Sequence, residues 1–365
     1  MKEKLYENLK ESNLFFLSLH SKELFHSNFI AWIAERKEEA FRTFFEDFTG
    51  IQVPNKFRVK REYKNFDLCI SALNDNDQEG SIFCIIENKV KSMPYAEQLE
   101  KYSEKLESMG AKDAKKVLLS LSTESLPNVD GWVCRTYKDL ANSLAKIVPL
   151  FEDYAQFLLK DYIEFIKTLH RLQKGKWGIP KKYKAAFTMD DETKELRIDD
   201  LCQKIIYSKI LNQILKELDE QNYVIGSSLN KLKAYKGEKK VFADCGLSRS
   251  IGLLEVKVKV NSDYVLGIQL QGSQYRYLAE SLKGNIHEKC TDKDNDIFAF
   301  VFNKKVCDPK NQTNNSIEVA GKKYSYCKFG DSFMYRYRDV SEANTEDIIE
   351  DIVKDCKALI KKVKE

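Results

Sequence analysis

The sequence predicts an α/β protein in two parts. The first part is a mixed sheet flanked by helices, and the second is an α+β domain of antiparallel strands. At roughly 150 residues per domain, 365 residues suggest two domains, and 43% hydrophobic residues are enough for sizeable cores. The apolar period also changes from helical to alternating and back along the first 170 residues. We place the domains at 1–172 and 195–365, with a basic linker at 173–194.

The first 50 residues have a helical period. Phenylalanines at 41, 44, 45 and 48 share one helix face, and Gly50 follows as a helix stop. Alternating side chains then predict strands at 57–63 and 66–71, and the polar stretch 74–80 is turn chemistry. The continuous apolar run Ile82–Ile86 predicts a strand buried on both faces.

The rest of the first part alternates between strands and helices. Pro94 opens a helix that Gly110 closes. Two further strands are expected at 117–121 and 132–137, and two helices at 138–148 and 152–171.

The second part begins after the linker, whose neighbourhood at 171–189 has six basic residues and no acidic one. Here the patterns predict helices at 195–219, 275–283 and 345–363. They predict strands at 253–260, 264–271, 296–303 and 323–339.

Composition excludes several classes of protein. A formal charge of +4 is too balanced for a histone-like polycation. No apolar run reaches 18 residues and no signal-peptide core is present, so we expect a cytoplasmic protein without membrane spans. The nine cysteines form no CxxC pair and are expected to be reduced thiols. Neither GxxxxGK[ST] nor GxGxxG occurs.

Two acids and a lysine mark a candidate site. Asp67 begins one predicted strand, and Glu87 and Lys89 end the next. If the turn is centred near residue 77, paired positions sum to about 154, and Asp67 then faces Glu87. Alternation places Lys89 on the same face as Glu87 and turns Asn88 away.

This arrangement favours a metal site. Carboxylates opposite each other on paired strands repel unless a cation offsets the repulsion, and Mg²⁺ binds one or two carboxylates with water and phosphate oxygens. A neighbouring lysine suits metal-assisted phosphodiester hydrolysis. The alternative is a solvated ion pair on a hairpin. Charges directly after the apolar run Ile82–Ile86 favour the metal site, because burying them is costly unless they are paired.

The sequence also resembles a known family. The segments NFDLCI, FCIIENKV and QLEKY are similar to the PD-(D/E)XK nuclease superfamily, in its RecB-like branch with the IENK motif, over about residues 20–140. The resemblance implies a restriction-endonuclease-like fold and a nuclease that uses Mg²⁺, with Mn²⁺ as a substitute. It assigns Asp67 and Glu87 to the metal and Lys89 to catalysis. Phe66, not the proline of the family's motif, precedes Asp67, and many members of the family lack that proline.

The resemblance also covers two helices. Gln98 and Tyr102 match the QxxxY element and are expected in the catalytic cleft, although Tyr102 equally fits an apolar helix stripe. Upstream, Glu23 and His26 match an acid and a His-Ser pair of that branch, which implies further metal contacts. The alternative for His26 is a structural role in a helix.

Basic and aromatic residues are candidate nucleic-acid contacts. Around the site we expect phosphate binding by five residues, or a merely charged strand face: Arg58, Lys60, Arg61, Lys64 and Lys91. In the second part, the segments at 275–277 and 335–338 interleave tyrosine with arginine, as stacking platforms for single strands do. Alternation along a strand gives the same pattern without a ligand and is the commoner explanation.

The sequence is consistent with three alternative functions. The first is a Mg²⁺-dependent nuclease acting on DNA, in bacterial defence or DNA processing. The second is a catalytically inactive nuclease-fold protein that binds nucleic acid or a protein. The third is an interaction protein whose function lies in the second part. Nucleic acid is the expected partner, and a homo-oligomer stays open. DNA against RNA and endo against exo cleavage are not determined by the sequence.

Overall fold

The computed structural model describes residues 4–18, 23–90, 96–121, 130–218, 223–290, 296–302, 315–319 and 321–364. The chain divides into two compact units, residues 1–178 with 191–201, and residues 179–190 with 202–365. Within the stretch expected as a linker, Trp177 and Tyr183 are fully buried. The domain boundaries at 172 and 195 stay predictions.

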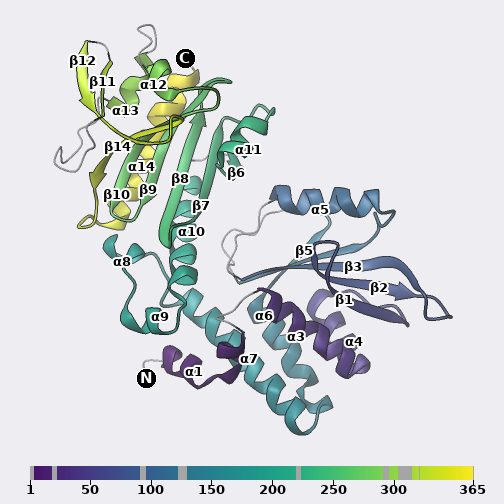
Figure 1. Cartoon of the computed structure of the whole chain (residues 1–365). Coiled ribbons are helices and arrows are strands. Elements are labelled where there is room, and N and C mark those ends of the chain that lie inside the picture. Colours follow the sequence, from purple (N-terminus) through teal and green to yellow (C-terminus); the bar gives the residue numbers. More distant parts are fainter. Residues whose placement is uncertain are drawn as a thin grey trace. The chain divides into compact units, whose positions relative to one another are not determined.

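The first unit is built on a five-stranded mixed sheet in the order β1-β2-β3-β4-β5 (Figure 1). β1, β2 and β3 are antiparallel, whereas β3, β4 and β5 are parallel. The strands are β1 (Phe57–Tyr63), β2 (Phe66–Leu73), β3 (Glu79–Lys89), β4 (Lys115–Ser120) and β5 (Trp132–Thr136). The mixed sheet predicted from the sequence is confirmed.

Helices cover both faces of this sheet (Figure 1). On one face lie α3 (Glu23–Arg36), α4 (Glu38–Thr49), α6 (Tyr137–Ile147) and α7 (Asp153–Lys174). On the other lies α5 (Ala96–Ser108), whose Leu99 and Leu106 pack into a core with Phe66 and Ile85. The remaining elements of the unit are α1 (Leu5–Glu11), α2 (Asn13–Leu17), η1 (Val148–Leu150) and α9 (Asp191–Glu195). Pro94, the predicted start of α5, lies outside the described residues.

The β2–β3 register has the predicted offset where the candidate site begins. Leu68 pairs with Ile86 and Cys69 pairs with Ile85, so paired numbers sum to 154. Nearer the turn, Leu73 pairs with Glu79, and the sum falls to 152. Register shifts between these regions place extra residues in β3. The predicted sum therefore holds at the site although the turn is centred one residue earlier.

The second unit is built on a seven-stranded sheet, antiparallel except for the β6–β7 pair, in the order β13-β14-β10-β9-β8-β7-β6. Its strands are β6 (Tyr223–Ile225), β7 (Val241–Ser248), β8 (Ile251–Lys259), β9 (Tyr264–Gln271), β10 (Gln274–Ser281), β13 (Cys327–Phe329) and β14 (Phe333–Asp339), with β11 (Ser316–Val319) and β12 (Lys322–Ser325) as a separate pair. Its helices are α8 (Lys184–Phe187), most of α10 (Asp199–Leu218), α11 (Leu229–Ala234), α12 (Ile286–Cys290), η2 (Asp296–Phe298), α13 (Ala299–Phe302) and α14 (Thr345–Lys364).

Two predictions for the second part are wrong. The expected helix at 275–283 is strand β10, which lies between β9 and β14. Because β10 is largely buried along its length, its side chains show no clean alternation. The expected strand at 296–303 is helical, in η2 and α13. Its short apolar run packs onto the sheet, with Phe298 against Tyr264, and such a run has no decisive period.

Two expectations about the chain's environment can be compared with the structure. Eight of the nine cysteines are described, and all eight are free thiols. In the described part of the chain, no helix is both long and apolar enough to cross a membrane.

Candidate active site

The acids and the lysine predicted to form a site converge at one end of the β2–β3 pair. Asp67 precedes Leu68, and Glu87 follows its partner Ile86, so the register brings both carboxylates to the same level. The Lys89 ammonium lies 2.6 Å from Glu87 Oε1, and 9% and 4% of the two side chains are exposed. This ion pair is therefore buried, unlike the solvated pair considered as the alternative.

Backbone N–H groups at the end of β3 donate hydrogen bonds to the carboxylates of Asp67 and Glu23. The N–H of Asn88 donates to Asp67 Oδ2 at 2.7 Å. The N–H of Val90 donates to Glu23 Oε1 at 3.1 Å, which brings the first residue of α3 to the same strand end. Charge-stabilised bonds of this kind fix where a carboxylate points.

In this group the negative charge of the carboxylates exceeds the positive charge of Lys89. Burial raises the pKa of Glu87 to about 7, and the carboxylate of Asp67 adds to the rise against the opposing charge of Lys89. Burial also raises the pKa of Asp67. Burial alone would lower the pKa of Lys89, but the carboxylates of Glu87, Glu23 and Asp67 outweigh it, so the pKa rises and the ammonium stays charged. Three carboxylates thus act on a single lysine.

The QxxxY pair reaches the same glutamate from α5. Gln98 Nε2 lies 3.3 Å from Glu87 Oε1 and 3.1 Å from the Tyr102 hydroxyl, which lies 3.5 Å from Glu87 Oε1. The Tyr102 ring packs edge-on against Phe66, with the centroids 5.3 Å apart. Tyr102 therefore belongs to the apolar stripe and also points its hydroxyl into the acid group.

His26 lies in an aromatic cluster. Its Nδ1 is 2.9 Å from the Tyr162 hydroxyl, and its ring stacks on Phe165 and meets Tyr137 edge-on. Burial lowers the pKa of His26 to about 3. None of these contacts is with Asp67 or Glu87, so the assignment of His26 to the metal stays a prediction without a supporting contact.

Sequence reasoning missed the part played by Asn88. Alternation correctly turns its side chain away from Glu87, and the side chain is fully buried. Its Nδ2 donates to the carbonyl oxygen of Glu23 at 2.9 Å, and its Oδ1 accepts from the Tyr137 hydroxyl at 2.6 Å. Asn88 thereby ties α3 and α6 to the end of β3. The signal was present in IENK, whose asparagine follows the glutamate directly.

The predicted phosphate contacts lie on and after β1. Arg58 and Lys64 are exposed. Lys60 forms an ion pair with Glu79, and Arg61 forms one with Glu35 at 3.5 Å. Lys91 lies outside the described residues. Contact of these side chains with nucleic acid stays a prediction.

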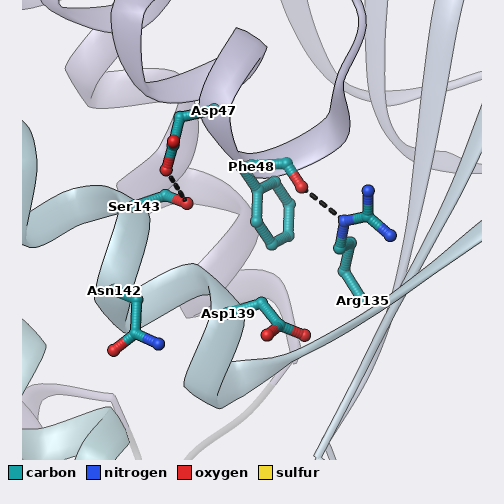
Figure 2. Close-up of a pocket in the computed structure, with 6 residues that line it drawn as sticks. All are labelled: Asp47, Phe48, Arg135, Asp139, Asn142 and Ser143. Carbon is teal, nitrogen blue, oxygen red and sulfur yellow. Dashed lines mark hydrogen bonds between the residues drawn. The ribbon is translucent and has the colours of Figure 1, made fainter.

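A separate pocket of about 230 Å³ lies between α4 and α6 (Figure 2). None of the predicted site residues lines it. Several of its polar groups are engaged within the protein: Arg135 donates to the carbonyl oxygen of Phe48, and Asp47 accepts from the Ser143 hydroxyl. We assign this pocket no ligand.

Comparison with known proteins agrees with the geometry. The family model of the PD-(D/E)XK nuclease superfamily matches residues 12–164. Over this segment the chain is similar to the PD-(D/E)XK nuclease superfamily. No curated protein and no solved structure matched the chain. The second unit lies entirely beyond the matched residues.

Members of the PD-(D/E)XK superfamily generally use divalent metals, and the donor set here fits such an ion. Asp67 and Glu87 offer hard carboxylate oxygens, and their charge exceeds that of Lys89. In the described part of the chain, no group of three or more His, Cys, Asp and Glu side chains is placed to hold a metal. An ion at Asp67 and Glu87 would therefore need water or phosphate oxygens as well, which suits Mg²⁺ better than a metal that demands a full protein cage.

Proposed function

We propose that the first unit is a metal-dependent nuclease that hydrolyses the phosphodiester bonds of DNA. The observation that carries the proposal is the buried pair Glu87–Lys89 with the half-buried Asp67 at one strand end, a group with an excess of negative charge. We further propose that it acts in the cytoplasm, in bacterial defence or DNA processing. That setting rests on likeness to the family alone.

In the proposed reaction each residue has its own task. Asp67 and Glu87 would hold the cation, which supplies an activated water and stabilises charge on phosphorus. Gln98 and Tyr102 orient Glu87 through Oε1. Lys89 offers a fixed positive charge to the phosphate oxygens as negative charge develops in the transition state. Mg²⁺ is the proposed ion, and Mn²⁺ a substitute.

The test is a cleavage panel with the full chain. Supercoiled, double-stranded and single-stranded DNA and an RNA of matched sequence are incubated with Mg²⁺, with Mn²⁺ and with EDTA. We expect cleavage of DNA with either metal and none with EDTA. Nicking of supercoiled DNA would identify an endonuclease. A protein that binds Mn²⁺ and DNA but cleaves no substrate would instead be the inactive nuclease-fold binder.

Lys89→Met separates chemistry from metal binding. Removing a positive charge beside the cation should leave Mn²⁺ affinity equal or slightly higher at pH 8. Single-turnover cleavage should fall by about 10²–10³, the usual cost of a lost electrostatic contact to the transition state. Asp67→Asn should lose both properties. Calorimetric Mn²⁺ titration and cleavage are measured on the same preparations.

The matched control is Lys112→Met, which alters an exposed lysine of the same unit. It should bind Mn²⁺ and cleave as the wild type does. Wild-type cleavage by Lys89→Met would show that Lys89 is a structural charge and that this assignment of roles is wrong.

A further inference from the structure

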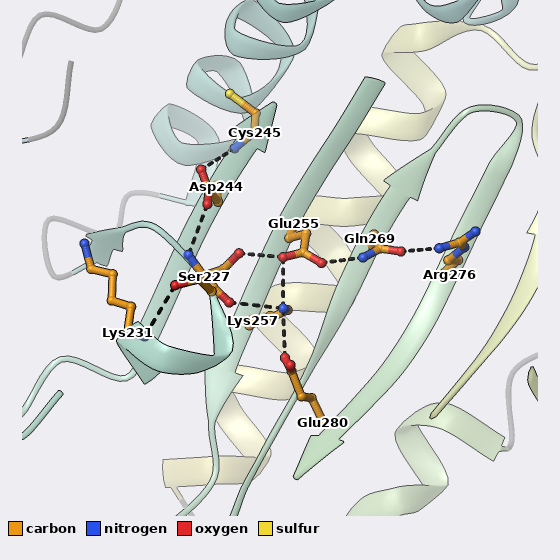
Figure 3. Close-up of polar contacts among 10 residues, drawn as sticks. Ser227, Lys231, Asp244, Cys245, Glu255, Lys257, Gln269, Arg276 and Glu280 are labelled. Carbon is orange, nitrogen blue, oxygen red and sulfur yellow. Dashed lines mark hydrogen bonds and ion pairs between the residues drawn. The ribbon is translucent and has the colours of Figure 1, made fainter. Parts of the chain in front are cut away.

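Strand alternation gives the second unit's sheet two different faces. The Tyr275 hydroxyl on β10 donates to Asp355 of α14 at 2.9 Å, so Tyr275 faces that helix. Arg276, the next residue, faces the opposite way. In Figure 3, α14 is the pale yellow helix behind the sheet. The tyrosine–arginine segments noted in the sequence are therefore divided between a helix-covered face and a second face.

A row of aromatic rings runs along β14 on this second face. Phe333, Tyr335 and Tyr337 alternate along the strand and pair with Glu280, Leu278 and Arg276 of β10. Neighbouring ring centroids are 5.9 and 6.3 Å apart, and all three side chains are partly exposed. Phe329 pairs with Phe333 from the neighbouring strand and is 71% exposed. The row thus reaches the sheet edge as accessible aromatic surface.

Arg276 places a positive charge beside this row. Its guanidinium lies 4.4 Å from the ring centroid of Tyr335. Its hydrogen bonds go to the side-chain carbonyls of Gln269, Gln271 and Gln274. Within the described residues no carboxylate forms an ion pair with it, although Glu255 acts on its charge at longer range. The amides orient the guanidinium but do not neutralise it.

The other buried cation of this face is already neutralised. Lys257 Nζ lies 2.9 Å from carboxylate oxygens of both Glu255 and Glu280 (Figure 3). Gln269 separates this ion group from Arg276, because it donates to Glu255 and accepts from Arg276. This ion group has two carboxylates for one lysine, and Arg276 is the cation on this side that no carboxylate of the described residues contacts directly.

Partly exposed rings beside a guanidinium that forms no ion pair among the described residues are suited to unpaired bases on a phosphate backbone. Stacking requires base faces, which a duplex keeps covered, and a single strand presents both bases and phosphates. An apolar peptide would use the rings but leave the charge of Arg276 without a partner. We propose that this face binds single-stranded DNA, with bases stacked on Phe333, Tyr335 and Tyr337 and a backbone phosphate on Arg276. The choice of DNA rests on the proposed function of the first unit.

The proposal is tested by binding without cleavage. Fluorescence anisotropy of a labelled oligo-dT is followed with the full chain in EDTA at several salt concentrations. Tyr337→Ala should weaken binding about tenfold, the cost of one stacked base, and leave the salt dependence unchanged. Arg276→Gln should weaken binding and also reduce the slope of log K against log salt by about 0.7, because one phosphate contact is lost. Arg276→Lys should restore most of that slope.

The matched control is Tyr154→Ala, which removes a 72% exposed tyrosine on α7 of the first unit and should not alter binding. Circular dichroism melting checks the fold of each variant. If Tyr337→Ala is unfolded, Phe329→Ala at the exposed sheet edge replaces it, with the same expected direction.

Each outcome separates this proposal from the proposed nuclease activity. A wild type that cleaves DNA with Mg²⁺ but does not bind oligo-dT in EDTA overturns the binding face and leaves the nuclease intact. Binding that none of the variants alters overturns it too, as does tighter binding of oligo-rU or duplex DNA. Binding with the expected variant responses but no cleavage on any substrate supports the face and overturns the nuclease.

Discussion

Glu87 and Glu255 are both buried glutamates two residues before a lysine, yet their environments act on them in opposite directions. Glu255 faces Asp244 across the β7–β8 pair and precedes Lys257, which repeats the acid–acid–lysine arrangement of the first unit. Burial disfavours its charge, but Lys257 and bonds from Ser227 and Gln269 outweigh burial and lower its pKa. The pKa of Glu87 instead rises to about 7.

The difference is one of compensation. Asp244 accepts backbone N–H bonds from Ser227 and Cys245, so the acids of the second unit are satisfied by the protein. Near Glu87, the carboxylates of Asp67 and Glu23 act on the same lysine. Lys257 is shared too, by Glu255 and Glu280, but hydrogen bonds from Ser227 and Gln269 further stabilise the charge of Glu255. A cation offsets repulsion only where repulsion exists. We therefore expect a metal at Asp67 and Glu87 and none at Asp244 and Glu255.

The buried His26 predicts a pH dependence of stability. Its pKa is about 3 in the folded protein and about 6.5 in the unfolded chain. Because the folded pKa of this base is lowered, the unfolded state binds more protons below pH 6.5. The stability that neutral His26 contributes is thus present above pH 6.5 and is lost as the pH falls toward 3. Acidification from pH 7 to 4 should cost about 3 kcal/mol through this group.

Urea unfolding across this pH range tests the effect. His26→Gln cannot titrate, and its amide can still bond the Tyr162 hydroxyl, so its unfolding free energy should fall less on acidification. His287→Gln, in the second unit, is the control and should fall as the wild type does. Equal pH slopes for wild type and His26→Gln would show that His26 is protonated in the folded state.

At the scale of elements, one side chain fastens two helices to the central strand of the first unit. Asn88 of β3 bonds the Glu23 carbonyl of α3 and the Tyr137 hydroxyl of α6. Asn88→Ala should lower the unfolding free energy of the first unit by about 2 kcal/mol, because the buried Tyr137 hydroxyl loses its partner. Denaturant unfolding measures the change.

The comparison for this variant is Asn142→Ala, on the exposed surface of α6. It should change the unfolding free energy by less than about 0.5 kcal/mol. If both variants lose the same free energy, the bonds of Asn88 contribute nothing beyond ordinary helix and strand propensity.

At the scale of the whole molecule, each unit has its own sheet and core, so calorimetry should resolve more than one transition. Mn²⁺ at about 100 times its Kd should raise the unfolding free energy of the first unit by about 2.7 kcal/mol. The melting temperature of one transition should then rise by several degrees. Asp67→Asn should remove this shift. Asp244→Asn should retain it, which makes it the matched acid in the second unit. A shift of both transitions, or one that persists in Asp67→Asn, would contradict the assigned metal site.

Much of the first unit could be predicted because its elements have clear periods. The phenylalanine stripe predicted α4, and the apolar run 82–86 predicted the buried strand β3. The predicted register also held at Leu68 and Ile86. The second unit was harder. β10 is buried along most of its length, and α13 is a short apolar run, so neither has a period that distinguishes helix from strand.

The sequence by itself determined the fold class, and it predicted the likeness to the nuclease superfamily and the candidate residues Asp67, Glu87 and Lys89, because alternation and the IENK motif are local properties of the chain. Tertiary structure decided what those residues experience. Burial and the approach of Glu23 from α3 leave Glu87 short of positive charge, whereas the charge of the similar Glu255 is stabilised by hydrogen bonds from partners distant in sequence, Ser227 and Gln269. Compensation of a buried charge is a sum over neighbours from several elements, and no spacing within one strand contains it.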